Sequence, residues 1–157
     1  MKFRDFLEQW GLVGLKINLG FLEGSFQPND PDRAAAWDLY IELLTRATTQ
    51  PLPADVGDEK SALDSVYELF PLTREILKKH GSGSGEFAKI AIPVLNQIVR
   101  PFTAKWHPLS MAKAFDNQTY RAEFRKELAV LQERLRTYTR ALAAMAAVED
   151  LTALESA

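Results

Sequence analysis

The sequence predicts an all-α protein: a four-helix bundle of up-down-up-down order with an N-terminal short helix and one strand-like or extended segment. Apolar residues recur at helical spacing over four long stretches, and short segments rich in proline, glycine or aspartate separate these stretches. Strand-like alternation is convincing in one place only. Helices joined by short connections pack as antiparallel neighbours, which favours a bundle.

The N-terminal segment, residues 1–29, is expected to lie against this bundle. An amphipathic helix is predicted over residues 3–10, and Gly11 ends it. Strand periodicity follows over residues 13–22. A single strand leaves its backbone groups unpaired, so we expect this segment to fold back near Gly20, to lie along the bundle, or to pair with another protein or a second copy of the chain. Its apolar side chains are the predicted partner-binding residues: Leu15, Ile17, Leu19 and Phe21.

The bundle is expected over residues 30–148 of a single domain that covers residues 1–157. Asp30 suits the N-cap of the first long helix and Pro31 its first turn. Trp37 is predicted on its buried face, and the helix ends before Gln50. Beyond the bundle the sequence predicts an acidic tail, residues 149–157.

The second long helix is expected to begin near Asp58, after a loop over residues 50–59. Leu63, Val66, Tyr67 and Phe70 form its predicted inner face. Pro71 should kink this helix or split it, since proline lacks the backbone N–H of a helical turn. The sequence GSGSG, residues 81–85, reads as a linker to the next helix.

The third long helix is predicted from Glu86, with an apolar face that reaches Phe102 and with kinks at Pro101 and Pro108. The fourth is predicted from Thr119 to Val148. Its apolar stripe is regular and comprises Tyr120, Phe124, Leu128, Leu131, Leu135, Tyr138, Leu142 and Met145.

Composition excludes several classes of protein. The chain has 157 residues and no cysteine, so disulfides, thiol nucleophiles and thiolate metal sites are impossible. The longest apolar run, residues 141–148, is far shorter than the roughly 20 residues that span a bilayer. We therefore expect a cytoplasmic protein without a membrane partner. The net charge is −2, distributed as −4 over residues 1–85, +5 over 86–148 and −3 over the tail.

The stretch LNQIVRPFTAKWHP, residues 95–108, places polar side chains on one side of the third helix. Such side chains make directed hydrogen bonds and hold anions, and a tryptophan offers a flat ring for stacking. The predicted ligand-binding residues are Asn96, Arg100, Thr103, Lys105, Trp106, His107 and, from the end of the first long helix, Arg46. The alternative is structural: Arg100 would bind the carbonyl that Pro101 leaves free, and His107 would favour the negative end of the helix dipole.

Other motifs are less informative. Arginines on the last helix favour either a solvated face or weak contact with nucleic acid: Arg121, Arg125, Arg136 and Arg140. The two histidines, His80 and His107, lie in no zinc or di-iron motif, and no nucleophile or dinucleotide motif occurs. The sequence therefore predicts a non-enzyme, with no catalytic residue, no metal and no cofactor.

Three stretches carry a resemblance to other proteins: AAAWDLYIELLTRATTQPL (34–52), VLNQIVRPFTAKWH (94–107) and AAVEDL (146–151). They resemble a family of small, all-helical bacterial proteins that accompany conflict or defence genes. The resemblance covers most of the chain and implies a helper subunit or sensor in a bacterial assembly. It implies no catalytic residue.

Three functions follow as hypotheses. The first is a non-catalytic protein-interaction module, either an adaptor or an accessory subunit, whose strand at 13–22 adds to a partner's sheet. The second is a sensor of a small anion or nucleotide that uses a cationic pocket at one end of the bundle, where Arg46 and Arg100 converge. The third is a weak nucleic-acid binder that uses the last helix.

Overall fold

The computed structural model describes residues 1–54 and 58–156, and the protein is all-α, with 73% of residues in helices. Of the predicted loop 50–59, residues 55–57 lie outside the described residues, as does Ala157 of the tail. The prediction of a strand is wrong, because the described residues contain only an isolated antiparallel bridge between Lys2 and Ser25. None of the described helices combines the length and apolar character needed to cross a membrane.

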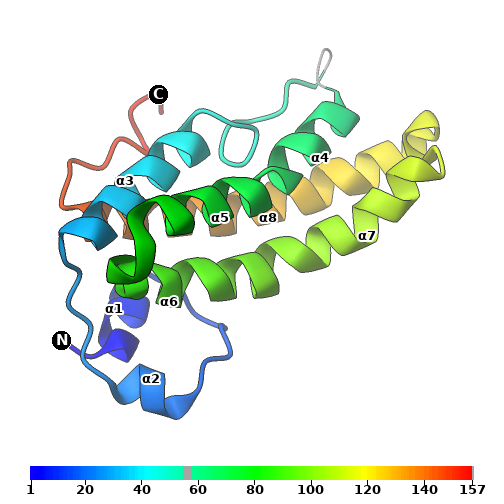
Figure 1. Ribbon diagram of the computed structural model, residues 1–157. Helices are drawn as coiled ribbons and strands as arrows, with labels where there is room; N and C mark the ends of the chain where they lie inside the picture. Colours follow the sequence, from blue (N-terminus) through cyan, green and yellow to red (C-terminus); the bar gives the residue numbers. More distant parts are fainter. Residues whose placement is uncertain (55–57, 157) are drawn as a thin grey trace.

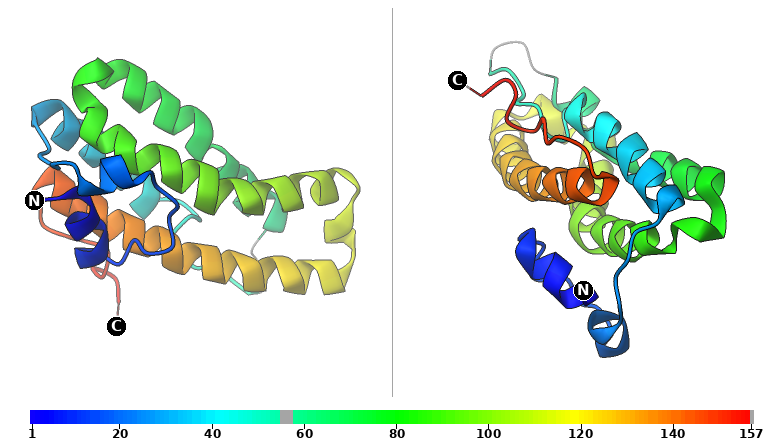
Figure 2. Two further views of the ribbon diagram at one scale, coloured as in Figure 1. Left: turned by 90° about the horizontal axis from the view of Figure 1, so that it is seen from below. Right: turned by 90° about the vertical axis from the view of Figure 1, so that its left-hand side faces the viewer.

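The long helices lie side by side (Figures 1 and 2). In chain order they are α3 (Asp30–Leu44), α4 and α5 (Glu59–Tyr67 and Leu69–His80), α6 and α7 (Gly85–Val94 and Arg100–Met111), and α8 (Gln118–Ala146). Helix α3 packs against α5, α6 and α8, and α4 packs against α7. The core therefore lies between α3, α4, α5, the bent α6–α7 helix and α8.

The buried stripe of α8 confirms the predicted periodicity. From Phe124 to Met145 every predicted stripe residue is buried, whereas Tyr120, in the first turn, is 40% exposed. Two other aromatic residues predicted on buried faces are also exposed: Trp37 on α3 and Tyr67 at the end of α4. Each lies at the margin of its helix's apolar face, where periodicity does not decide between core and surface.

Side-chain caps fix where the helices begin. Asn29, one residue before the predicted cap, accepts a hydrogen bond from the Asp32 N–H at 3.0 Å, and the Asp32 carboxylate accepts one from the Asn29 N–H at 2.9 Å. Asp32 is fully buried, and its second oxygen accepts a hydrogen bond from the Phe87 N–H at 2.9 Å. One carboxylate thus joins the N-termini of α3 and α6, where helix dipoles favour negative charge.

The predicted break at Pro71 occurs three residues earlier. Helix α4 ends at Tyr67, Glu68 caps both helices, and α5 begins at Leu69, so that Pro71 lies in the first turn of α5. Proline is tolerated in a first turn because its missing N–H has no helical partner there.

Helices α6 and α7 form one long bent helix. The π-helical turn η2 (Leu95–Val99) joins them, and the Arg100 N–H donates to the Leu95 carbonyl five residues back. Helix α7 then continues through Pro108 to Met111. The bend is consistent with the π turn and with Pro93 and Pro101 on either side of it.

The N-terminal segment contains two short helices, α1 (Phe3–Gln9) and α2 (Leu19–Glu23), beside the ends of α6 and α8 (Figure 2). Gly11 ends the first helical region as predicted, with a φ of 71° that favours glycine. Asn18 caps α2, since its side-chain oxygen accepts a hydrogen bond from the Gly20 N–H at 2.8 Å. No residue of α2 is buried.

Candidate functional site

Trp106, predicted as a stacking surface for a ligand, is part of the core. Its ring is 0% exposed and lies 5.9 Å from the ring of Phe115 and 5.2 Å from that of Phe124. The predicted role as an accessible stacking surface is therefore wrong, because protein atoms surround the ring.

Thr103 forms a hydrogen bond within its own helix, and Lys105 forms ion pairs with α8. Thr103 is buried, and its hydroxyl donates to the Arg100 carbonyl at 3.2 Å. Lys105 reaches across to α8 and forms ion pairs with Glu127 at 2.5 Å and Glu123 at 2.9 Å. The hydrogen bond to Glu127, followed by the one to Glu123, raises the pKa of the Lys105 ammonium. Lys105 therefore links α7 to α8.

Arg46 follows α3 and is bound by two carboxylates. Its guanidinium donates to Glu42 at 2.9 Å and to Glu68 at 2.7 Å. The Arg46 guanidinium therefore joins α3 to the junction between α4 and α5. Arg100 instead contacts the ring of Phe70, so the two cations predicted to converge bind different residues.

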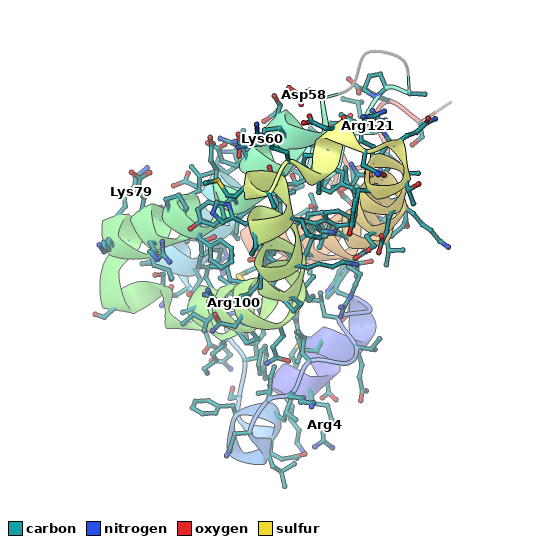
Figure 3. All side chains as sticks on the ribbon, turned by 90° about the vertical axis from the view of Figure 1, so that its right-hand side faces the viewer. Arg4, Asp58, Lys60, Lys79, Arg100 and Arg121 are labelled. Carbon is teal, nitrogen blue, oxygen red and sulfur yellow. The ribbon has the colours of Figure 1, made fainter. Side chains whose placement is uncertain are left out.

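The side chains of Arg100, which Figure 3 labels, and of His107 contact two aromatic residues that α4 and α5 supply. The Arg100 guanidinium lies 4.7 Å from the centre of the Phe70 ring, and the His107 ring stacks on Tyr67 at 5.7 Å. Arg74 approaches the same Phe70 ring, at 5.9 Å. We call this set the basic-aromatic surface: Tyr67, Phe70, Arg74, Arg100 and His107.

Asn96 orients the guanidinium of Arg100. Its side-chain oxygen accepts two hydrogen bonds from Arg100, at 3.1 Å and 3.3 Å. Within residues 1–54 and 58–156, neither Arg74 nor Arg100 forms an ion pair with a carboxylate, and both are exposed. Sequence reasoning found Asn96, Arg100 and His107 but missed Arg74, which no motif distinguishes from other surface arginines.

Gln97 fixes the segment that precedes α2. Its side-chain amide accepts a hydrogen bond from the Lys16 N–H at 2.7 Å and donates one to the Lys16 carbonyl at 2.8 Å. Leu15 and Ile17, on either side of Lys16, are half-buried against the core, whereas Leu19 and Phe21 on α2 are 63% and 56% exposed.

An apolar groove separates α2 from α6, and we call it the N-terminal groove. Its volume is about 270 Å³, and it is lined by Phe3, Ile17, Phe21, Gly85, Ala88, Lys89, Ile92 and Pro93. Ile92 is 49% exposed at its edge, although it is a large aliphatic residue. Two of the four predicted partner-binding residues, Ile17 and Phe21, thus line a groove.

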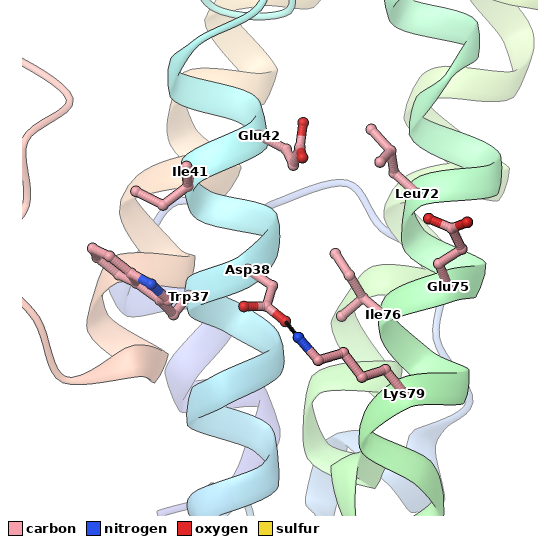
Figure 4. Close-up of a pocket in the computed structure, with 8 residues that line it drawn as sticks. All are labelled: Trp37, Asp38, Ile41, Glu42, Leu72, Glu75, Ile76 and Lys79. Carbon is pink, nitrogen blue, oxygen red and sulfur yellow. Dashed lines mark hydrogen bonds and ion pairs between the residues drawn. The ribbon is translucent and has the colours of Figure 1, made fainter.

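A second groove lies between α3 and α5 (Figure 4). Beside it Asp38 accepts hydrogen bonds from His80 at 2.7 Å and Lys79 at 3.2 Å. Burial raises the pKa of Asp38, but these two hydrogen bonds and the electrostatic attraction of Lys79 and His80 together hold the pKa below its usual value. The lining residues include no serine or threonine that His80 could activate, so we interpret the pair as a link between helices.

A larger groove, about 820 Å³, lies between the C-terminal segment, the end of α3 and α8. Several of its polar side chains form hydrogen bonds with backbone carbonyls. Thr49 and Gln50 donate to the carbonyls of Leu43 and Leu44, and Arg136 donates to that of Thr49 at 2.8 Å. Few polar groups in this groove are therefore free to orient a ligand.

The arginines of α8 do not form one free basic face. Arg121 donates to the Phe115 carbonyl at 2.7 Å, and Arg125 pairs with Glu59 at 3.1 Å. Because Arg136 also binds backbone, three of the four arginines considered for nucleic-acid contact hold neighbouring segments in place.

The chain matches no protein-family model, no curated protein and no solved structure. The resemblance to bacterial defence-associated proteins therefore stays a prediction. Among the described residues, no group of three or more histidine, aspartate or glutamate side chains has an arrangement that could hold a metal ion.

Proposed function

We propose that this chain is a non-catalytic protein-interaction module, an adaptor or accessory subunit in the cytoplasm, whose N-terminal groove binds a helix of a partner protein. The observation that carries the proposal is the apolar groove flanked by exposed Phe21 and Ile92. Large exposed apolar side chains grouped around a groove are typical of protein-binding surfaces.

The size and lining of the groove favour a protein side chain over a small molecule. Pockets for small molecules hold about 300–1,000 Å³ and contain several convergent polar groups. The N-terminal groove is slightly smaller, at about 270 Å³, and Lys89 is its one charged lining residue. Lys89 is paired with Glu86 at 2.5 Å. Apolar anchor residues of a partner would fill such a groove without leaving polar groups unpaired.

The mode of binding follows from the helical conformation of residues 19–23. Strand addition requires an exposed strand edge, which this segment lacks. An amphipathic partner helix instead presents apolar residues at i, i+3, i+4 and i+7, and these fit a groove between two helices. The proposal treats α3, α4–α5, α6–α7 and α8 as a four-helix bundle of up-down-up-down order. The short connections and the side-by-side helices of Figure 1 support that order.

Site-specific photo-crosslinking in cells that express the protein tests this proposal. A benzophenone amino acid replaces Phe21 or Ile92, and in a control it replaces Val130, which is 62% exposed on α8. We expect the two groove positions to give one cross-linked protein, identified by mass spectrometry, that the control position does not give. Cross-linking that is absent from the groove, or equal at Val130, would contradict the proposal. A product with twice the mass of the chain would instead show self-association.

A further inference from the structure

We propose that the partner's docking segment is acidic, and that the basic-aromatic surface binds its carboxylates. This inference rests on the proposed function and names the chemistry of the partner. Two guanidinium groups lie near one phenylalanine ring, at 4.7 Å for Arg100 and 5.9 Å for Arg74. The two guanidinium groups are therefore no farther apart than the sum of these distances, and a bound anion offsets the repulsion between their like charges.

The Arg100 guanidinium is held in position before any ligand arrives. Asn96 accepts two of its hydrogen bonds, and the Phe70 ring lies within cation–π distance. A guanidinium has five N–H donors, and a carboxylate accepts two of them in parallel. Because Arg100 is already oriented, a carboxylate binds with a smaller loss of side-chain entropy.

The bent helix has one acidic residue, Glu86, which pairs with Lys89, and residues 87–115 contain no aspartate or glutamate. Of the acidic residues on α4 and α5, Glu68 pairs with Arg46 and Asp64 with Lys60. Glu75, next to Arg74 in the chain, lines the groove between α3 and α5. The side chains of Arg74 and Arg100 therefore remain exposed, with no ion pair in the described part of the chain.

The basic-aromatic surface is within reach of a helix docked in the N-terminal groove. Ile92 at the groove and Arg100 belong to the same bent helix and are eight residues apart, which is about 12 Å at the helical rise per residue. A partner helix of about three turns spans that distance. The expected segment therefore has apolar residues in one half and aspartate or glutamate in the other.

A carboxylate ligand fits this surface better than nucleic acid does. Strong nucleic-acid binders neutralise many phosphates with extended rows of lysine and arginine. The basic-aromatic surface has only two arginines and one histidine, and the protein has a net charge of −2. Most of the α8 arginines considered for nucleic-acid contact bind backbone carbonyls or carboxylates instead. Carboxylate groups on one short segment need no larger surface.

Fluorescence anisotropy with labelled poly-L-glutamate of about 15 residues tests the inference without the partner. The test variant is Arg74→Gln/Arg100→Gln. The matched control is Arg134→Gln/Arg140→Gln, which removes two exposed α8 arginines that also lack ion pairs in the described residues. We expect low-salt binding to weaken about fivefold in the test variant and to change less than twofold in the control.

Each outcome decides one question. Equal binding by the test variant and the control overturns the inference. Tighter binding of an oligothymidylate of equal length, lost in the test variant, also overturns it and assigns the surface to nucleic acid. Phe21→Ser should leave poly-L-glutamate binding unchanged, because that probe has no apolar side chains to fill the groove. Binding of poly-L-glutamate without cross-linking at Phe21 therefore rejects the groove and retains the anionic ligand.

Discussion

Trp106 lies in an aromatic cluster between α7 and α8. Its ring meets Phe124 edge-on at 89° and stacks on Phe115 at 21°. Its Nε1–H has no hydrogen-bond partner among the described atoms, so the indole is held by the packing of the rings and by the Lys105 ammonium, which lies 5.0 Å from the centre of the indole ring. The free energy gained by burying an aromatic ring is larger than the free energy lost by leaving one buried N–H without a hydrogen bond.

Replacing Trp106 with alanine should therefore lower the free energy of unfolding by about 3–5 kcal/mol, because the change leaves a cavity in the core. Trp37→Ala is the matched control, since Trp37 is 42% exposed and its removal should cost about 1 kcal/mol or less. Urea unfolding measures both values. Similar losses in the two variants would mean that Trp106 is not a core residue.

Asp38 gives the fold a predictable response to acid. Its pKa in the folded protein is lowered from 3.8 by the hydrogen bonds from His80 and Lys79 and by their electrostatic attraction, which together exceed the opposing effect of burial. A lowered folded pKa means that the charged carboxylate stabilises the protein above the unfolded pKa and that this stability is lost as pH falls through the folded pKa.

Asp38→Asn should lower the free energy of unfolding by about 1 kcal/mol at pH 7. Below about pH 3.8 the difference from wild type should shrink, since protonation then removes the same charge from the wild-type protein. Urea unfolding at several pH values measures it, with Asp64→Asn at an exposed pair as the control. A difference that stays constant from pH 7 to pH 2 would show that Asp38 contributes through packing.

At the scale of elements, sequence periodicity predicted the long helices because each buries one continuous apolar face, as α8 does from Phe124 to Met145. It failed over residues 13–22, where alternating apolar residues belong first to extended chain and then to α2. The missed signal was Asn18, an N-cap residue two positions before Gly20. Period-two alternation alone does not tell a strand from an extended segment pinned by side chains.

The candidate site was predictable only where one helix supplied it. Asn96, Arg100 and His107 share one side of the bent helix, and spacing placed them together. Tyr67 and Arg74 join them because α4 ends at Tyr67 and α5 begins at Leu69 with a different orientation. Trp106 faces the core and Lys105 faces α8, because the helix continues through Pro101 and Pro108, where the sequence predicted kinks.

Gln97 is the residue through which the bundle holds the N-terminal segment. Removing its amide in Gln97→Ala deletes both hydrogen bonds to Lys16 and should free the backbone of residues 13–18. Hydrogen exchange of the Lys16 amide should become at least about tenfold faster, because its N–H loses its acceptor, whereas amides in α8 should stay unchanged. Gln50→Ala, which removes one side-chain hydrogen bond to backbone elsewhere, is the control. Unchanged exchange at Lys16 would mean that the apolar contacts of Leu15 and Ile17 suffice.

At the scale of the whole molecule, residues 86–148 carry a net charge of +5, and several of their cationic side chains bind other groups of the chain. Lys105 and Arg125 pair with carboxylates, and Arg121 and Arg136 bind backbone carbonyls. The cations that stay exposed without ion pairs in the described chain include Arg100, Arg134 and Arg140. Among these, Arg100 alone lies beside a second arginine and an aromatic ring, so local geometry rather than net charge selects the surface.

The contacts of the partner with the N-terminal groove and with the basic-aromatic surface should respond differently to salt. This is testable once the partner cross-linked at Phe21 has been identified. Salt screens exposed charges over about 10 Å at 0.1 M and about 3 Å at 1 M, but it does not weaken apolar burial. The dissociation constant of the wild-type complex should therefore rise severalfold between about 0.05 M and 0.5 M NaCl.

The variant Arg74→Gln/Arg100→Gln should bind the partner more weakly at low salt, and its dissociation constant should change little with added salt. Phe21→Ser should bind more weakly at every salt concentration and keep the wild-type salt dependence, because its arginines are intact. Isothermal titration calorimetry of the three proteins measures how the dissociation constant changes with salt concentration. An equal salt dependence in all three proteins would show that Arg74 and Arg100 do not contact the partner.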